Sequence, residues 1–177
     1  MNRCVWALAI WLVCMVCDAQ TYALERVNDS LTCLTLTTGD YTDRYVIRFP
    51  VYRLETGDVD GDGLEDAIVG VVNRTRHDPN LRRRIHLYKN VGGRIRPMWL
   101  GSQLGGILED FRFIDGQVRT LQSTTDGRYV VMTHRWRPFG LGADSILVKN
   151  VSREDGENKL KTILTHPKEG SEKQESR

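Results

Sequence analysis

Cysteine is scarce in this 177-residue chain outside the first 17 residues. Cys4, Cys14 and Cys17 lie in that N-terminal segment, which we expect to be removed, so that only Cys33 remains. A single cysteine excludes an internal disulfide, and the fold then depends on an ordinary apolar core. Cys33 lies in the alternating run SLTCLTL, where we expect a small buried apolar residue; a reactive thiol or an intermolecular bridge is the alternative.

Apolar runs long enough to span a membrane are also lacking. The N-terminal run over residues 4–16 has about 13 residues, whereas a membrane-spanning helix needs about 20. Arg3 precedes this run and a small residue, Ala19, follows it, which is the pattern of a signal peptide. We therefore predict a signal peptide over residues 1–19, and a mature protein that is secreted, periplasmic or at the cell surface. A lipid anchor at Cys17 is the alternative, which the residues before it support poorly.

Residues that form a catalytic constellation are not evident either. No serine lies in a Gly-x-Ser-x-Gly elbow. Glu109 and Asp110 are adjacent on a predicted strand, so they point to opposite faces and make a poor acid–base pair. The four histidines are scattered along the chain: His77, His86, His134 and His166. We favour a non-catalytic protein, with a secreted hydrolase or an accessory domain of one as the alternative.

Charge of one sign does not dominate the composition. The net charge is +2 and 40% of the residues are hydrophobic, which is typical of a soluble globular domain. This balance excludes a largely disordered chain and a strongly basic nucleic-acid binder. The basic run over residues 74–84 is interpreted as a solvated hairpin loop, with an anion or polysaccharide patch as the alternative.

What the sequence does contain is a series of short runs rich in β-branched and aromatic residues, bounded by Gly, Asp, Asn or Pro. Turn signals at Gly92-Gly93, Asp115-Gly116 and Asp126-Gly127 predict hairpins between successive runs. We therefore predict an all-β domain with antiparallel sheets over residues 20–165. The run NKLKTILT at its end favours a final strand, and residues 166–177, which are almost without apolar side chains, predict a flexible charged tail.

The clearest motif is the acidic stretch GDVDGDGLED at residues 57–66. Carboxylates this close repel one another, so the stretch makes physical sense when a cation lies among them or when it is a solvated turn. Counted from Asp58, aspartates occupy the first, third, fifth and ninth positions, and glycine occupies the sixth, where a sharp bend is needed. Calcium takes six to eight oxygen ligands, which alternate residues of a curled loop can supply. The spacing predicts a calcium site.

The flanks of the loop distinguish between families of calcium loops. EF-hand and dockerin loops carry a carboxylate at the twelfth position and continue into a helix, but the twelfth residue is Val69, within a strand-like run. The stretch GDVDGDGLEDAIVGV resembles instead the FG-GAP or VCBS repeat, the calcium-loop blade of integrin α-chain propellers and many secreted bacterial proteins. The resemblance extends over residues 50–100. It implies that the ligands are Asp58, Asp60, Asp62, the Leu64 carbonyl and Asp66.

A complete propeller is not expected, because propellers usually have at least four blades and the chain has one good acidic loop. We predict propeller-blade-like sheets or a small β-sandwich. In such a domain, calcium would stabilise a turn and do no chemistry.

The segment THRWRPFGLG provides the most suggestive binding residues. Arg135, Trp136 and Arg137 could stack on a sugar ring or anchor a protein partner. The alternative is that Trp136 faces the core while the arginines face water. We therefore expect an exported calcium-binding β-domain that acts as a binding or interaction module for a protein or carbohydrate ligand.

Overall fold

The computed structural model describes residues 20–76, 78–101 and 104–163. The predicted signal peptide and charged tail lie outside these residues. The described strands and the single helix follow this order along the chain: β1 (Gln20–Asn28), β2 (Leu31–Thr38), β3 (Tyr41–Ile47), β4 (Val51–Gly57), β5 (Asp66–Thr75), β6 (Asp78–Val91), β7 (Arg94–Leu100), β8 (Ile107–Ile114), β9 (Gln117–Ser123), β10 (Tyr129–Arg137), β11 (Gly140–Val151) and α1 (Arg153–Lys161).

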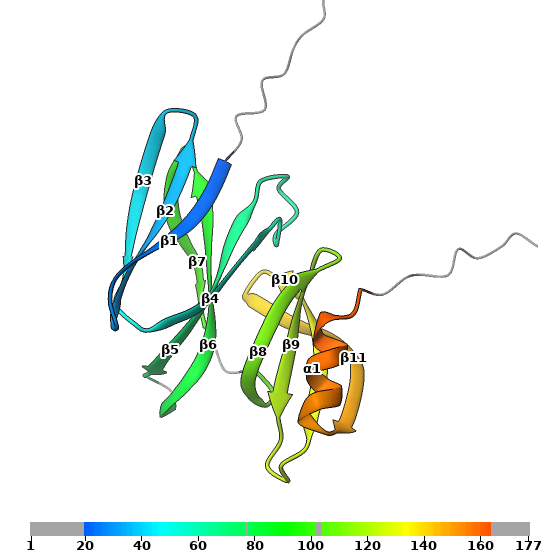
Figure 1. Ribbon diagram of the computed structural model, residues 1–177. Helices are drawn as coiled ribbons and strands as arrows, with labels where there is room; N and C mark the ends of the chain where they lie inside the picture. The colour runs from blue at the N-terminus through cyan, green and yellow to red at the C-terminus, as the bar shows by residue number, and fades with distance from the viewer. Residues whose placement is uncertain (1–19, 77, 102–103, 164–177) are drawn as a thin grey trace, which may run out of the picture.

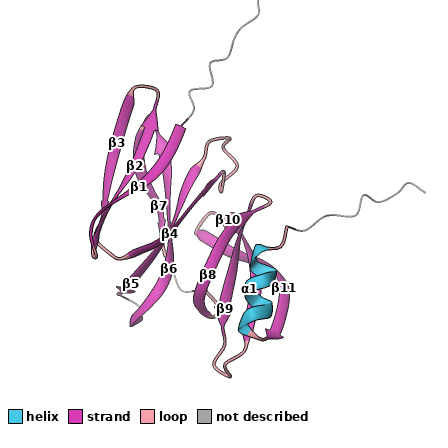
Figure 2. Cartoon of the chain, in the orientation of Figure 1, coloured by secondary structure: helices cyan, strands magenta, loops and turns pink. Residues whose placement is uncertain are grey.

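The strands form three antiparallel sheets, in which each strand pairs with its neighbour in sequence (Figures 1 and 2). The sheet orders are β1-β2-β3, β4-β5-β6-β7 and β11-β10-β9-β8. The predicted all-β antiparallel fold is confirmed. The residues that the structure describes contain three sheets, fewer than a propeller usually has, and each four-stranded sheet is a sequential meander of the kind found in propeller blades.

The three predicted hairpin turns are confirmed. Gly92-Gly93 joins β6 to β7 with Val91 opposite Arg94, and both glycines have positive φ, at 61° and 78°. Asp115-Gly116 joins β8 to β9 in the same way, with φ values of 53° and 71°. Two successive positive φ values define the turn whose twist matches that of a hairpin, and glycine and aspartate tolerate them best.

The central sheet, β4–β7, packs on both of its faces. On β5, Val69 and Val71 belong to an apolar cluster with residues of the first sheet such as Leu34, whereas Ile68 belongs to a cluster with Phe111 of the third sheet. Successive side chains of a strand point to opposite faces, so a strand that is covered on both sides is apolar throughout. This explains the unbroken run AIVGVV directly after the acidic loop.

An ion-pair network joins the central sheet to the third sheet. Arg53 of β4 donates from Nε and Nη2 to the two carboxylate oxygens of Asp110 on β8, at 2.8 and 2.9 Å. Arg112 and Glu55 extend the network on either side. A bidentate pair of this kind orients the two strands relative to each other as well as neutralising both charges.

The expected final strand over residues 158–165 is wrong, because residues 153–161 form helix α1. Ser152 caps the helix, with its Oγ accepting a hydrogen bond from the N–H of Asp155 at 3.2 Å. Leu160 is fully buried and packs in a cluster with Leu121 and Val131 of the third sheet. The capping signal and the docking of Leu160 outweigh the short strand-like pattern.

Cys33 is a buried free cysteine in β2, as predicted from its alternating run. Within the described ranges, no helix has the length and apolar character that crossing a membrane requires.

Candidate metal centre

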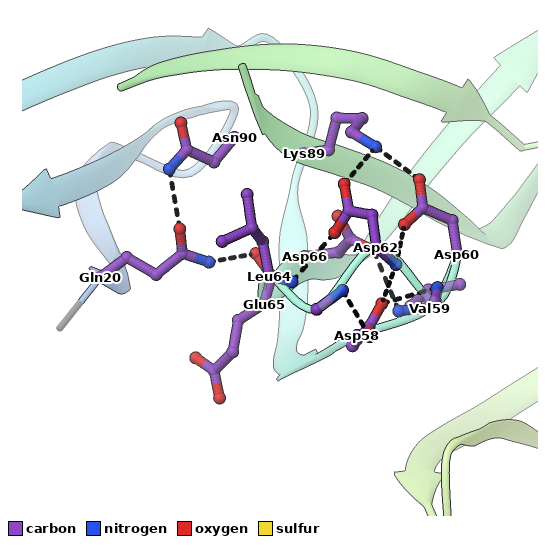
Figure 3. Close-up of polar contacts among 12 residues, drawn as sticks. Gln20, Asp58, Val59, Asp60, Asp62, Leu64, Glu65, Asp66, Lys89 and Asn90 are labelled. Carbon is purple, nitrogen blue, oxygen red and sulfur yellow. Dashed lines mark hydrogen bonds and ion pairs between the residues drawn. The ribbon is translucent and has the colours of Figure 1, made fainter. Parts of the chain in front are cut away.

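The acidic loop connects β4 to β5, the first two strands of the central sheet (Figure 3). Gly57 and Asp66 are register partners at the ends of these strands, so the sheet holds the two ends of the loop together. The loop therefore extends from a rigid base that is packed on both faces.

Asp58 organises the curl of the loop. One of its carboxylate oxygens accepts hydrogen bonds from the N–H groups of Gly61 and Asp62, at 2.7 and 3.1 Å, and the other accepts from Gly63 N–H at 3.0 Å. Gly61 and Gly63 have φ values of 81° and 84°, a region that glycine enters without steric cost. The two glycines of the motif thus allow the backbone to wrap around the first aspartate.

Asp60 and Asp62 form the next local turns. The N–H of Asp62 donates to Asp60 Oδ1 at 3.3 Å, and the N–H of Leu64 donates to Asp62 Oδ1 at 3.0 Å. Each carboxylate keeps its second oxygen free of the loop backbone contacts. Leu64, whose carbonyl the resemblance implies as a ligand, lies in this turn and is 45% exposed.

Asp66 differs from the other aspartates because it is buried, with 1% of its surface exposed. Its Oδ2 accepts a hydrogen bond from Val59 N–H at 3.0 Å, while its Oδ1 is buried and has no hydrogen-bond partner among the described residues. Burial raises the pKa of Asp66 to about 6, and the nearby charges of Asp60 and Asp62 contribute to the rise. A buried carboxylate oxygen without a partner is costly, and a cation would remove that cost.

Three of the predicted ligands converge. Asp58, Asp60 and Asp66 each offer a carboxylate oxygen, and these oxygens lie within 4.8 Å of one another. The donor set is all oxygen and negatively charged, which fits a hard cation such as calcium better than zinc, whose sites in proteins usually include nitrogen or sulfur ligands. The unpartnered oxygen of Asp66 fits the same interpretation. These residues would hold the ion, which would supply positive charge to the curled loop.

Asp62, the remaining predicted side-chain ligand, contacts a residue that the sequence did not point to. Lys89 of β6 donates from Nζ to Asp62 Oδ2 at 2.8 Å and to Asp60 Oδ2 at 2.5 Å. The ammonium lowers the pKa of Asp62, and the two carboxylates raise the pKa of Lys89. Lys89 is far from the loop in sequence, but the β5–β6 register, with Ala67 opposite Tyr88, brings it alongside.

Gln20 and Asn90 fix the far side of the loop. Gln20 of β1 donates from Nε2 to the carbonyl of Glu65 at 2.6 Å, and its Oε1 accepts from Asn90 Nδ2 at 2.7 Å (Figure 3). The loop is therefore tied to the first sheet as well as to its own. Only the pairing of distant strands brings these two amides to the loop, so local sequence patterns gave no sign of them.

The segment predicted to bind a ligand lies at the β10–β11 hairpin. Trp136 is partly buried and packs in the apolar cluster between the central and third sheets. Arg135 and Arg137 are exposed and form ion pairs with Asp144 at 3.1 and 3.8 Å. The most exposed large apolar side chain of the segment is that of Phe139, at 94%. The two arginines and Phe139 are thus more accessible to a partner than Trp136.

Two of the four histidines, His86 of β6 and His134 of β10, lie in the core. His86 and His134 are 3% and 2% exposed, and burial lowers the pKa of each to about 4. His134 Nε2 lies 2.9 Å from Thr120 Oγ1, and His86 Nδ1 lies 3.3 Å from the Tyr88 hydroxyl. Both are neutral at pH 7 and contribute to packing.

The geometry of the acidic loop is the main basis for a functional assignment. Comparisons of the chain with protein-family models, with curated proteins and with solved structures found no match.

Proposed function

We propose that this chain is a calcium-binding β-domain, in which the loop over residues 57–66 holds one calcium ion. The ligands are Asp58, Asp60, Asp62, the carbonyl of Leu64, and Asp66. The observation that carries the proposal is the buried Asp66 carboxylate, which has an unpartnered oxygen and lies close to the carboxylates of Asp58 and Asp60. Calcium satisfies that oxygen and offsets the repulsion between the aspartates.

The ion has a structural role in this proposal. The loop joins the first two strands of the sheet that packs against both others, so fixing the loop stabilises the centre of the molecule. The assignment to an FG-GAP or VCBS type of blade is supported by the same position, since the loop lies between the first and second strands of a four-stranded meander.

The domain acts, in this proposal, as an exported non-catalytic module that binds a protein or a carbohydrate. The burial of His86 and His134 supports this function over hydrolysis, since neither side chain is accessible to a substrate. The exposed Phe139, two residues after Arg137, is the contact we favour on the hairpin. Aromatic and arginine side chains dominate many binding interfaces.

The test is calcium binding by calorimetry and thermal unfolding in calcium or chelator. Calcium that binds only the folded state stabilises it by an amount that grows with the logarithm of the calcium concentration above Kd, and reaches about 2.7 kcal/mol at 100 times Kd. Asp60→Ala should abolish both the binding heat and the stabilisation. Asp40→Ala, which makes the same change at an exposed position of the β2–β3 turn, is the matched control and should bind calcium as the wild type does. Wild-type protein that neither binds millimolar calcium nor gains stability from it would refute the proposal.

A further inference from the structure

Lys89 occupies the side of the acidic loop on which Asp60 and Asp62 present their second oxygens (Figure 3). Its side chain is 25% exposed, and that of Asp60 is 14% exposed, so water screens this contact only in part. Lys89 extends from β6, where it pairs with Arg96 of β7 and directly follows Tyr88, which pairs with Ala67 of β5, so the ammonium comes from a strand that is held in the sheet.

We propose that Lys89 is a tethered competitor of calcium, which sets the calcium affinity of the loop. The ammonium and the ion are alternative partners for the carboxylates of Asp60 and Asp62. This inference rests on the calcium site proposed above. The calcium site is supported independently of Lys89 by the buried oxygen of Asp66, which has no hydrogen-bond partner among the described residues.

The contacts of Asp62 support a competition between Lys89 and calcium. The motif supplies four aspartates at alternate positions, but only Asp58, Asp60 and Asp66 have oxygens within 4.8 Å of one another among the described residues of the loop. Asp62 gives one oxygen to Leu64 N–H and the other to Lys89. Release of the ammonium frees a carboxylate oxygen on Asp62 and another on Asp60 for a metal.

Repulsion between the ammonium and the calcium ion also supports this competition. Two cations that share carboxylates repel each other, and more strongly in a partly buried loop than in water. Calcium therefore has to displace the ammonium, which weakens its apparent affinity. When calcium is scarce, Lys89 neutralises part of the negative charge of Asp60 and Asp62, which reduces the repulsion within the loop. The expected result is a site that responds at high calcium concentrations and a fold that persists at low ones.

The test compares calcium affinity in the full chain of the wild type and of Lys89→Met, measured by calorimetry with calcium alone. Methionine keeps the length of the side chain and removes its charge. The Kd of Lys89→Met for calcium should be about tenfold lower than that of the wild type, because the two partly exposed ion pairs of Lys89 no longer compete with calcium. Lys89→Arg should bind within about threefold of the wild type, since its charge is retained. Lys149→Met, the same charge change at an exposed position of β11, is the control and should leave Kd unchanged.

A second measurement covers the case in which Lys89→Met folds poorly. Lys89→Gln is melted in chelator and in saturating calcium, and its gain in melting temperature from calcium should exceed that of the wild type. Unchanged or weaker calcium binding in both variants, with normal binding by the wild type, would overturn the role of Lys89 and leave the calcium site standing. Failure of the wild type and of all variants to bind calcium would overturn both proposals.

Discussion

Replacing Asp66 with asparagine should make the protein more stable in chelator and less responsive to calcium. The asparagine side chain has nearly the same shape, and its carbonyl oxygen could still accept the Val59 N–H bond that Asp66 accepts at 3.0 Å. What the change removes is a negative charge in a position that is 1% exposed, next to other carboxylates. The charge is costly when no metal neutralises it.

The size of the effect follows from the pKa of Asp66. Its rise from 3.8 to about 6 corresponds to about 3 kcal/mol at pH 7, at 1.36 kcal/mol for each pKa unit. Because the folded-state pKa is the higher one, the folded protein loses this stability as the pH rises through 6. The unfolding free energy of Asp66→Asn in chelator at pH 7 should therefore exceed that of the wild type by about 2–3 kcal/mol. The advantage should disappear below about pH 4.

Urea unfolding in chelator and in about 10 mM calcium measures both the stability of Asp66→Asn without metal and its response to calcium. The order of stability should reverse: the variant is more stable in chelator, and the wild type gains from calcium while the variant does not. A variant that is less stable than the wild type in chelator would show that the charge of Asp66 is not costly. A variant that gains as much from calcium as the wild type would show that Asp66 is not a ligand.

Three further predictions concern the core. His86 and His134 titrate near pH 4 when folded and near 6.5 when unfolded, so their contribution to stability is present above pH 6.5 and is lost as the pH falls toward 4. Protonation of each histidine should lower the unfolding free energy by about 2 kcal/mol between pH 7 and pH 5. Urea unfolding of a variant with glutamine at both positions should show a smaller loss than the wild type, and an equal loss would contradict the assignment. Gly70→Ala would place a Cβ 2.6 Å from the ring of Tyr52 on the neighbouring strand β4 and 2.9 Å from the ring of Phe111 on β8, and should lower the unfolding free energy by about 1–3 kcal/mol; no change would argue against these close contacts. Leu160→Ala should cost about 2–5 kcal/mol in the same assay, and a cost near zero would mean that α1 is not docked.

Many of the strands and all three predicted hairpin turns were evident from the sequence, because they depend on neighbouring residues. Gly92-Gly93 and Asp115-Gly116 adopt positive φ, which few other residues tolerate. The curl of the acidic loop is local in the same sense, since Asp58 bonds N–H groups within five residues of itself. Alternate aspartates with interposed glycines therefore predict the loop without knowledge of the fold.

The helix was missed although part of its signal is local. Ser152 and Asp155 form a capping pair, but the turns that follow contain Gly156 and few apolar residues, so propensity alone does not favour a helix. Gly156 is buried, and a Cβ there would lie 2.7 Å from Leu121. Docking of the helix on the third sheet, with Leu160 as its apolar contact, stabilises a segment that is weakly helical alone.

The all-β class, the hairpins and the acidic loop follow from local patterns in the chain, since period-two alternation, turn residues and Asp spacing act over a few residues. The stacking of three sheets, the burial of Asp66 and the position of Lys89 depend instead on contacts between distant segments. Strand pairing brings Lys89 of β6 to a loop that precedes β5, and the packing around β5 removes Asp66 from water. Charge and burial at the site arise from these long-range contacts, and for that reason the aspartate spacing alone cannot reveal them.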